Sequence, residues 1–152
     1  MELREVRLND PEVLPLLAGL TEEYERRYGP VDEMSSVTTE EFDPPGGAFV
    51  VLLEEGETIA GGGFRRLSAT TCEVKRMWTA PDHRRSGHAT TVLSALERIA
   101  SERGYLLLRL ETGPAQPEAQ AMYLGRGYRP IPPFGRYELA SAFEYPLRAV
   151  TD

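Results

Sequence analysis

The residues best suited to chemistry in this sequence form the stretch Arg84-Arg85-Ser86-Gly87-His88-Ala89, which comes directly before a helical pattern. In that pattern apolar residues recur at three- and four-residue spacing, at Ala89, Val92, Leu93, Leu96, Ile99 and Ala100. The first N–H groups of a helix have no partner within it, and the helix dipole places about half a positive charge there. Gly87 and Ala89 would let an anion approach these groups, and the arginines would add charge-assisted contacts. The stretch is therefore predicted to bind a phosphate group.

Two predicted strands flank this loop and helix. The first, Thr71 to Thr79, ends before Pro81, because proline cannot continue a strand ladder. The helix ends at Arg103-Gly104, and the second strand, Tyr105 to Thr112, contains consecutive leucines typical of a strand covered on both faces. The order strand, helix, strand predicts a right-handed parallel crossover, in which the phosphate loop joins the first strand to the helix.

The same spacing rules predict the elements on either side. Asn9-Asp10-Pro11 supplies a cap and a first-turn proline for a helix that ends near Gly29-Pro30. Within a later hairpin, Gly61-Gly62-Gly63 indicates a bulge or a close backbone approach. The other predicted elements are strands at Glu2 to Leu8, Ala48 to Glu54 and Thr58 to Leu67, a short helix at Thr39 to Phe42, a helix at Pro117 to Leu124, and closing strands at Tyr128 and Leu139 to Leu147.

A wider pattern makes the phosphate loop specific. Arg84-x-x-Gly87-x-Ala89 follows a strand ending in Met77-Trp78-Thr79 and precedes Ala119-x-x-x-Tyr123. This combination resembles the acetyl-CoA signature of the GCN5-related N-acetyltransferases (GNATs), and the resemblance spans about Ala48 to Tyr128. It implies a single domain over residues 1–152 with the α/β GNAT fold: a mixed, mostly antiparallel sheet of six to seven strands, about four flanking helices and a central, splayed parallel strand pair. The implied enzyme transfers the acetyl group of acetyl-CoA to a primary amine of a small molecule or peptide, by direct attack in a ternary complex.

The resemblance also implies which residues hold the cofactor. The backbone amides of Arg85 to Ala89 would bind the pyrophosphate, with the Thr90 hydroxyl as a further donor. The pantetheine arm would pair with the main chain near Met77 and Thr79 as an added strand does, and an amide near Met77 would polarise the thioester carbonyl. Gln116 stands where relatives often carry asparagine. The complete predicted cofactor site is Met77, Trp78, Thr79, Arg84, Arg85, Ser86, Gly87, His88, Ala89, Thr90, Gln116 and Ala119.

Acetyl transfer needs a neutral amine and a proton donor for the leaving thiolate. The resemblance makes Tyr123 the catalytic acid, and the alternative is a tyrosine that only packs its helix on the sheet. Glu73 stands eleven residues before the phosphate loop, at the same offset as the catalytic glutamate of histone-acetylating relatives. The alternative for Glu73 is an ion pair with Lys75 or Arg109. Glu111 acting through water, or solvent alone, are further routes for the proton.

The sequence does not identify the acceptor. Loops at residues 28–43 and 130–137 are expected to border its site. Arg136 in the second loop favours an acceptor that bears a carboxylate, whereas carboxylates in the first loop favour a cationic one; these are Asp32, Glu33, Glu40 and Glu41. Aromatic residues that could line the site, although such residues on strands are usually core, are Trp78, Phe134, Tyr137 and Phe143.

Composition argues against several other classes of protein. The net charge of −7 over 152 residues is unsuited to general nucleic-acid binding, and no apolar run is long enough to span a membrane. The single cysteine, Cys72, and the two histidines, His83 and His88, predict neither an internal disulfide nor a metal site. We expect a cytoplasmic protein, with a homodimer as the common arrangement among relatives. Neither the Gly-x-x-x-x-Gly-Lys-Ser/Thr nor the Gly-x-Gly-x-x-Gly motif occurs. The alternative to an enzyme is a non-catalytic acyl-CoA sensor with the same fold.

Overall fold

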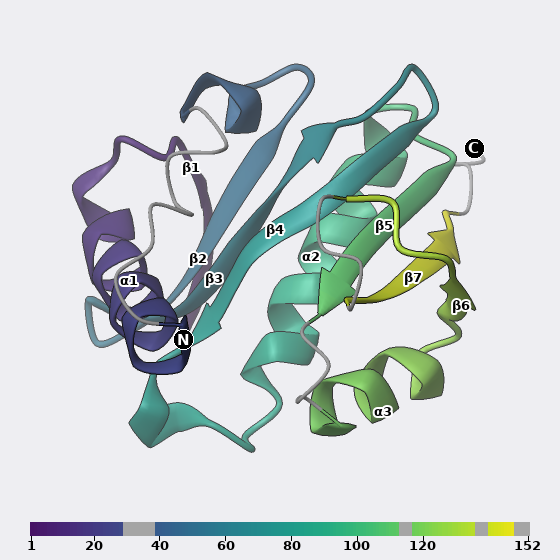
Figure 1. The fold of residues 1–152 in the computed structure, drawn as a ribbon. Coiled ribbons are helices and arrows are strands. Elements are labelled where there is room, and N and C mark those ends of the chain that lie inside the picture. Colours follow the sequence, from purple (N-terminus) through teal and green to yellow (C-terminus); the bar gives the residue numbers. More distant parts are fainter. Residues whose placement is uncertain (29–38, 113–116, 136–139, 148–152) are drawn as a thin grey trace.

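The computed structural model describes residues 1–28, 39–112, 117–135 and 140–147. Its seven strands form one sheet in the order β1-β2-β3-β4-β5-β7-β6, and β4 and β5 are the parallel pair (Figure 1). The strands are β1 (Glu2–Val6), β2 (Ala48–Glu54), β3 (Glu57–Arg66), β4 (Thr71–Thr79), β5 (Leu107–Thr112), β6 (Arg129–Ile131) and β7 (Ser141–Pro146). The helices are α1 (Leu14–Tyr28), α2 (His88–Glu102) and α3 (Pro117–Gly125), with the 3-10 helices η1 (Pro11–Val13), η3 (Thr39–Phe42) and η4 (Pro81–His83).

The predicted fold class is confirmed by this mixed, mostly antiparallel sheet. Within the described ranges it carries three α-helices rather than about four, because the short helix predicted at Thr39 to Phe42 is a 3-10 helix. None of the helices in these ranges combines the length and the apolar character that crossing a membrane requires.

Alternate residues of β2 show that an apolar core lies on each face of the sheet. Val50 and Leu52 belong to a core shared with α2, whereas Val51 and Leu53 belong to a second core shared with α1. Figure 1 shows α1 and α2 on opposite faces. The apolar stripe predicted for α2 is buried, at Val92, Leu93, Leu96, Ile99 and Ala100. The side chains of two helices therefore sandwich the sheet and fix the strands that border the site.

The N-terminal helix begins as its sequence predicts. The Asp10 side chain accepts a hydrogen bond from the Glu12 N–H at 3.0 Å, and Pro11 occupies the first turn of η1. This cap leads directly into α1, which packs on the sheet through Leu16 and Leu20. A Cβ at Gly19 would overlap the indole of Trp78, so glycine at this position allows α1 to pack directly against Trp78 of β4.

A bulge interrupts β4 opposite the glycines of β3. The register shifts between Gly61 and Gly63, where β4 contains one more residue than β3. Arg76 lies in the bulge with a φ of 60°, and a Cβ at Gly62 would overlap the Met77 side chain. Both the bulge and the close backbone approach predicted from the three glycines are present, and the extra residue is on the neighbouring strand.

The parallel strands β4 and β5 are paired over a short stretch and then separate. Their pairs are Thr71–Leu107, Cys72–Leu108 and Glu73–Arg109. Beyond Glu73, β4 continues to Thr79 with β3 but not β5 as its partner, so β4 and β5 each have one open edge where they diverge. The predicted splay is therefore present at the centre of the sheet.

One expectation about β5 is wrong. The leucine run was predicted to be covered on both faces, but Leu106 precedes the strand and is 53% exposed. Tyr105 also lies outside the strand, and its hydroxyl donates a 2.6 Å hydrogen bond to the Gly46 carbonyl. The leucine run therefore includes both the turn before β5 and the beginning of β5. The spacing of the leucines alone does not show where the turn ends and the strand begins.

Candidate functional site

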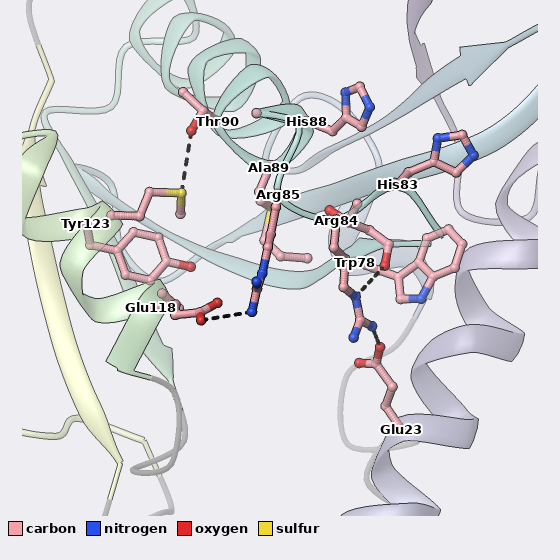
Figure 2. Close-up of a pocket in the computed structure, with 15 residues that line it drawn as sticks. Glu23, Trp78, His83, Arg84, Arg85, His88, Ala89, Thr90, Glu118 and Tyr123 are labelled. Carbon is pink, nitrogen blue, oxygen red and sulfur yellow. Dashed lines mark hydrogen bonds and ion pairs between the residues drawn. The ribbon is translucent and has the colours of Figure 1, made fainter. Parts of the chain in front are cut away.

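A cleft of about 620 Å³ opens where β4 ends and α2 begins (Figure 2). Figure 2 shows Glu23 and Trp78 on one side of it, Glu118 and Tyr123 on the other, and the loop before α2 between them. Its walls come from α1, β4, the loop before α2, α2 itself and α3. The lining residues are Glu23, Met77, Trp78, Thr79, His83, Arg84, Arg85, Gly87, His88, Ala89, Thr90, Glu118, Ala119, Met122 and Tyr123.

The loop before α2 turns its backbone outward through two left-handed residues. Arg85 has a φ of 66° and Gly87, the N-cap of α2, has a φ of 81°. No side chain caps the helix, so its first N–H groups are not used by a capping residue. Neighbouring backbone N–H groups in left-handed turns form anion-binding concavities, and the helix dipole adds positive potential at the same point. This end of the cleft is suited to a phosphate group.

The two arginines of the loop contact carboxylates on the two helices that flank the cleft. Arg84 forms an ion pair with Glu23 of α1 and donates a 3.2 Å hydrogen bond to the Thr79 carbonyl at the end of β4. Arg85 approaches Glu118 of α3 at 3.4 Å and is otherwise exposed to solvent. Arg84 therefore ties α1 to the loop, whereas Arg85 is free to turn toward an anion.

Tyr123 lies on the side of the cleft that α3 forms (Figure 2). Its ring packs against Tyr128 and Phe143, with centroids 5.5 and 5.6 Å away, and the residue is 6% exposed. Its hydroxyl points into the cleft (Figure 2) and has no hydrogen-bond partner among the residues that the structure describes. Burial raises the pKa of Tyr123 to about 12, so the phenol keeps its proton at neutral pH.

A buried network holds the ring that supports Tyr123. The Tyr128 hydroxyl donates a 2.7 Å hydrogen bond to Glu97 of α2, and Arg126 donates to the other carboxylate oxygen at 2.5 Å. Tyr128 also stacks on Tyr145, with centroids 4.7 Å apart. Burial, followed by the Glu97 carboxylate, raises the pKa of Tyr128. These contacts connect α2 to the segment after α3 and fix the position of the tyrosine pair.

Comparison with known proteins identifies the family. The profile of the Acetyltransferase (GNAT) family matches residues 17–128, which include the cleft and its loop. The chain belongs to this family. The Escherichia coli (strain K12) protein "Uncharacterized N-acetyltransferase YjgM" is 30% identical over 138 residues, which cover 85% of this chain and 82% of that protein. Membership of the GNAT family confirms the resemblance stated from the sequence.

Solved structures agree on the GNAT fold. An acetyltransferase of the GNAT family from Staphylococcus aureus superposes with a TM-score of 0.81 at 16% identity, covering 97% of this chain and 100% of that one. The PaiA N-acetyltransferase from Thermoplasma acidophilum, solved in complex with coenzyme A, superposes with a TM-score of 0.69 at 16% identity, covering 96% and 99%. At such identities the likeness establishes the architecture.

Most of the cofactor residues predicted for this GNAT chain come together in the cleft. Those that line it are Met77, Trp78, Thr79, Arg84, Arg85, Gly87, His88, Ala89, Thr90 and Ala119, together with the predicted acid Tyr123. Ser86 is exposed on the loop but does not line the cleft. Gln116 lies outside the described residues, as do Asp32, Glu33, Arg136 and Tyr137. Their predicted roles stay predictions.

The predicted base lies elsewhere. Glu73 is 3% exposed, does not line the cleft, and accepts a 3.0 Å hydrogen bond from Arg65, which also binds Glu41. Its ion-pair partner is thus Arg65 of β3 rather than Lys75 or Arg109. Neighbouring Cys72 is fully buried, and burial raises the pKa of its thiol to about 12, as expected of a core residue.

Four lining residues lie outside the predicted site: Glu23, His83, Glu118 and Met122. His83 directly precedes the phosphate loop in the sequence. Glu118 stands beside the predicted Ala119, and Met122 beside Tyr123, so their position on one helix could have indicated them. Glu23 is 61 residues from Arg84, and nothing in the sequence connects the two. Within the described ranges, no three His, Cys, Asp or Glu side chains gather as metal ligands would.

Proposed function

We propose that this chain is an acetyl-CoA-dependent N-acetyltransferase that acts on a primary amine of a small molecule or peptide. The observation that carries the proposal is the single cleft that joins an uncapped helix N-terminus to the open edge of β4 and to a protonated tyrosine. Each of these three features serves a different part of an acyl-CoA molecule. Residues 1–152 would act as one domain, and the cytoplasmic location and homodimer stay predictions.

The phosphate end of the cleft fits a pyrophosphate. The backbone amides of Arg85 to Ala89 would hold it, because the left-handed residues turn them outward and Gly87 places no side chain over them. Arg85 would move from Glu118 to the anion, since its side chain is 84% exposed and weakly held. The Thr90 hydroxyl, now 3.5 Å from the Met122 sulfur, is a further donor.

The reaction centre would lie between the β4 edge and Tyr123. The main chain at Met77 and Thr79 is on the open edge that β5 leaves, so it can pair with an extended amide-bearing arm as a strand would. The amine nitrogen attacks the thioester carbonyl carbon, the carbon–sulfur bond breaks, and Tyr123 gives its proton to the departing thiolate. A phenol with a raised pKa is held in the protonated form that this step needs.

Glu73 is our candidate for the group that takes the proton of the amine, directly or through water. Its position supports the assignment, because Glu73 is the last residue of β4 that pairs with β5 and therefore lies where the gap between the two strands opens. Its ion pair with Arg65 weighs against it, since a paired carboxylate is a weaker base. Glu111 and solvent are the remaining routes for this proton.

A thiol-release assay with acetyl-CoA and a panel of amines tests the proposal, with calorimetry of coenzyme A binding beside it. An enzyme releases thiol in proportion to the amine supplied. The alternative, a non-catalytic acyl-CoA sensor, binds coenzyme A and releases thiol at the hydrolytic background with every amine. Absence of coenzyme A binding by folded protein would refute both functions.

A further inference from the structure

A row of alternating charges crosses five strands of the sheet. The backbone registers align Arg65 of β3, Glu73 of β4, Arg109 of β5, Glu144 of β7 and Arg129 of β6. Residues opposite one another on neighbouring strands point to the same face, so all five side chains lie on one side of the sheet. We call these five residues the charge row.

Each carboxylate in and beside the charge row already has a partner. Glu73 is bound by Arg65, and Glu144 accepts hydrogen bonds from Arg109 at 2.8 Å and from Arg129 at 3.2 Å. Hydrogen bonds from Arg129 and Arg109 lower the pKa of Glu144, which keeps it ionised. Glu111, two residues along β5, accepts hydrogen bonds from the backbone N–H groups of residues 134 and 135. These carboxylates are therefore poorly placed to bind an additional cation.

The cations on this face are not all used. Arg109 donates through Nε to Glu144, but among the described residues its two terminal nitrogens make no hydrogen bond. Its guanidinium lies 5.6 Å from the centroid of the Phe134 ring, and the hydrogen bonds to Glu111 hold that segment in place. Lys75 likewise has no ion-pair or hydrogen-bond partner among the residues that the structure describes. Charged donors that have no partner among the described residues are suited to an anion.

Both cations stand where the strands separate. Glu73 and Arg109 are the last residues paired between β4 and β5, and Lys75 follows two residues later on the same face of β4. Lys75 and Arg109 therefore flank the opening of the gap between the strands. On the other face, residues of the core beneath α2 line the cleft proposed for acetyl-CoA, so the face of the charge row is left to the acceptor.

We propose that the acceptor amine also carries a carboxylate, which Arg109 binds with help from Lys75. This inference rests on the proposed function, because it concerns the acceptor of the same transfer. It selects free amino acids and amino-acid derivatives with an intact carboxylate, and it disfavours polyamines and aminoglycosides, whose extra positive charges would face Lys75 and Arg109. Phe134 and Glu144 position the guanidinium by holding its plane and its Nε.

The test compares matched acceptors in the thiol-release assay. Each amino acid is paired with its own carboxamide, which keeps the amine and the side chain and removes the negative charge, and polyamines and aminoglycosides are assayed alongside. We expect KM for the carboxamides to exceed that of the acids by roughly 10- to 100-fold, the value of a hydrogen bond to a charged group. Arg109→Gln should abolish this preference, and Arg109→Lys should restore part of it.

Two further variants keep the test decisive. Lys75→Gln leaves the charge row intact and should reduce the preference for acids by a smaller factor. It can therefore replace Arg109→Gln as the test variant if Arg109→Gln is unstable. Arg98→Gln removes an exposed arginine of α2 that pairs with Glu102, and it should leave the preference unchanged. The preference is read as a ratio of KM values, which a general loss of stability does not alter.

The outcomes separate this inference from the function on which it rests. Equal KM for acids and carboxamides, or turnover confined to polyamines or aminoglycosides, would overturn the carboxylate site and leave the transferase intact. A preference for acids that persists in both Arg109→Gln and Lys75→Gln would also overturn it. If coenzyme A binds but every amine, acid or not, stays at background, then the proposed transfer itself is wrong.

Discussion

The two ends of the site are built from different parts of the chain. At the phosphate end the backbone supplies the binding groups, through two left-handed residues and the start of α2. At the proposed acceptor side, where β4 and β5 separate, two side chains would supply them: Arg109, which the charge row holds in place, and Lys75. The first end needs one short segment, whereas the second needs the whole sheet to be in register.

This difference implies different tolerance to change. A backbone site depends on a few dihedral angles, so it withstands most side-chain substitutions and fails when a glycine is replaced. A row of paired side chains is more sensitive to substitution, because loss of an arginine weakens the charge compensation of a buried carboxylate, Glu73 or Glu144. The acceptor side should therefore be the part of the molecule in which stability and specificity change together.

Removal of the Tyr123 hydroxyl should give the largest effect and leave both ends of the site unchanged. Tyr123→Phe keeps the packing on Tyr128 and Phe143 but removes the proton donor, so we expect kcat to fall by roughly 10²–10⁴. Coenzyme A affinity, measured by calorimetry, should stay within about twofold. Tyr145→Phe, which removes a hydroxyl from the same aromatic stack, is the control. Full turnover in Tyr123→Phe would eliminate the acid role.

Replacement of Glu73 distinguishes a base from a structural member of the charge row. Glu73→Gln weakens the bond to Arg65, and we expect a loss of about 1–3 kcal/mol in the free energy of unfolding. Glu144→Gln, in the same row but farther from the strand opening, should cost a similar amount. If Glu73 is the base, then kcat falls at least 100-fold in Glu73→Gln alone. Equal kcat in the two variants removes Glu73 from the chemistry.

Gly19 tests how tightly α1 must lie against the sheet on the acceptor side. The added Cβ in Gly19→Ala would overlap the Trp78 indole, so we expect a loss of about 1–3 kcal/mol from overpacking despite the better helix propensity of alanine. Denaturant unfolding measures the change. Gly125→Ala is the matched control, because a Cβ there meets nothing within 4 Å. Comparable stability of the two variants would show that α1 can move away from Trp78 without cost.

Gly87 tests the backbone end. Gly87→Ala forces alanine into a left-handed residue with φ of 81°, and we expect coenzyme A affinity to fall about tenfold as the loop relaxes. Gly56→Ala carries the same strain, with φ of 82°, in a turn away from the cleft. Both variants should lose about 1 kcal/mol of stability, but Gly56→Ala should bind coenzyme A normally. Equal affinities would disprove the amide cradle.

The smallest effect concerns pH. Because burial raises the pKa of Tyr123 to about 12, the acid should remain protonated, and the pH–rate profile should show no alkaline fall from this group below about pH 11. The raised pKa also makes stability depend on pH. The contribution of Tyr123 to the free energy of unfolding is fully present below the unfolded pKa of about 10, and it is lost as pH rises toward the folded pKa. A fall in kcat with an apparent pKa near 9, absent in Tyr123→Phe, would contradict this.

The loop and helix start at the proposed phosphate end could be predicted because their structure is local. Six consecutive residues and one helical pattern determine which amides are unpaired, and the structure places Arg84, Arg85 and Gly87 together as expected. The strands Ala48–Glu54 and Thr71–Thr79 were predicted to the residue, since turns and proline limit them. Local rules therefore suffice where a feature depends on neighbours in the chain.

The acceptor side could not be predicted in the same way. The sequence offered Glu73 as a base or, alternatively, as the ion-pair partner of Lys75 or Arg109. Side-chain geometry across strands selects the partner, and Arg65 lies opposite Glu73 on β3. Likewise the Glu23–Arg84 pair depends on how α1 packs, which Gly19 and Trp78 decide through shape. Long-range packing sets such contacts, and a single sequence does not reveal it.

Only three residue pairs join β4 to β5, and through them the two halves of the sheet. A ligand bound in the gap beyond them, as we propose for the pantetheine arm, would add hydrogen bonds along the open edge of β4. Amide hydrogens along the open edge of β4 should thus exchange with solvent quickly in free protein and slowly in the loaded one, which makes the exchange rate of this strand a direct gauge of occupancy.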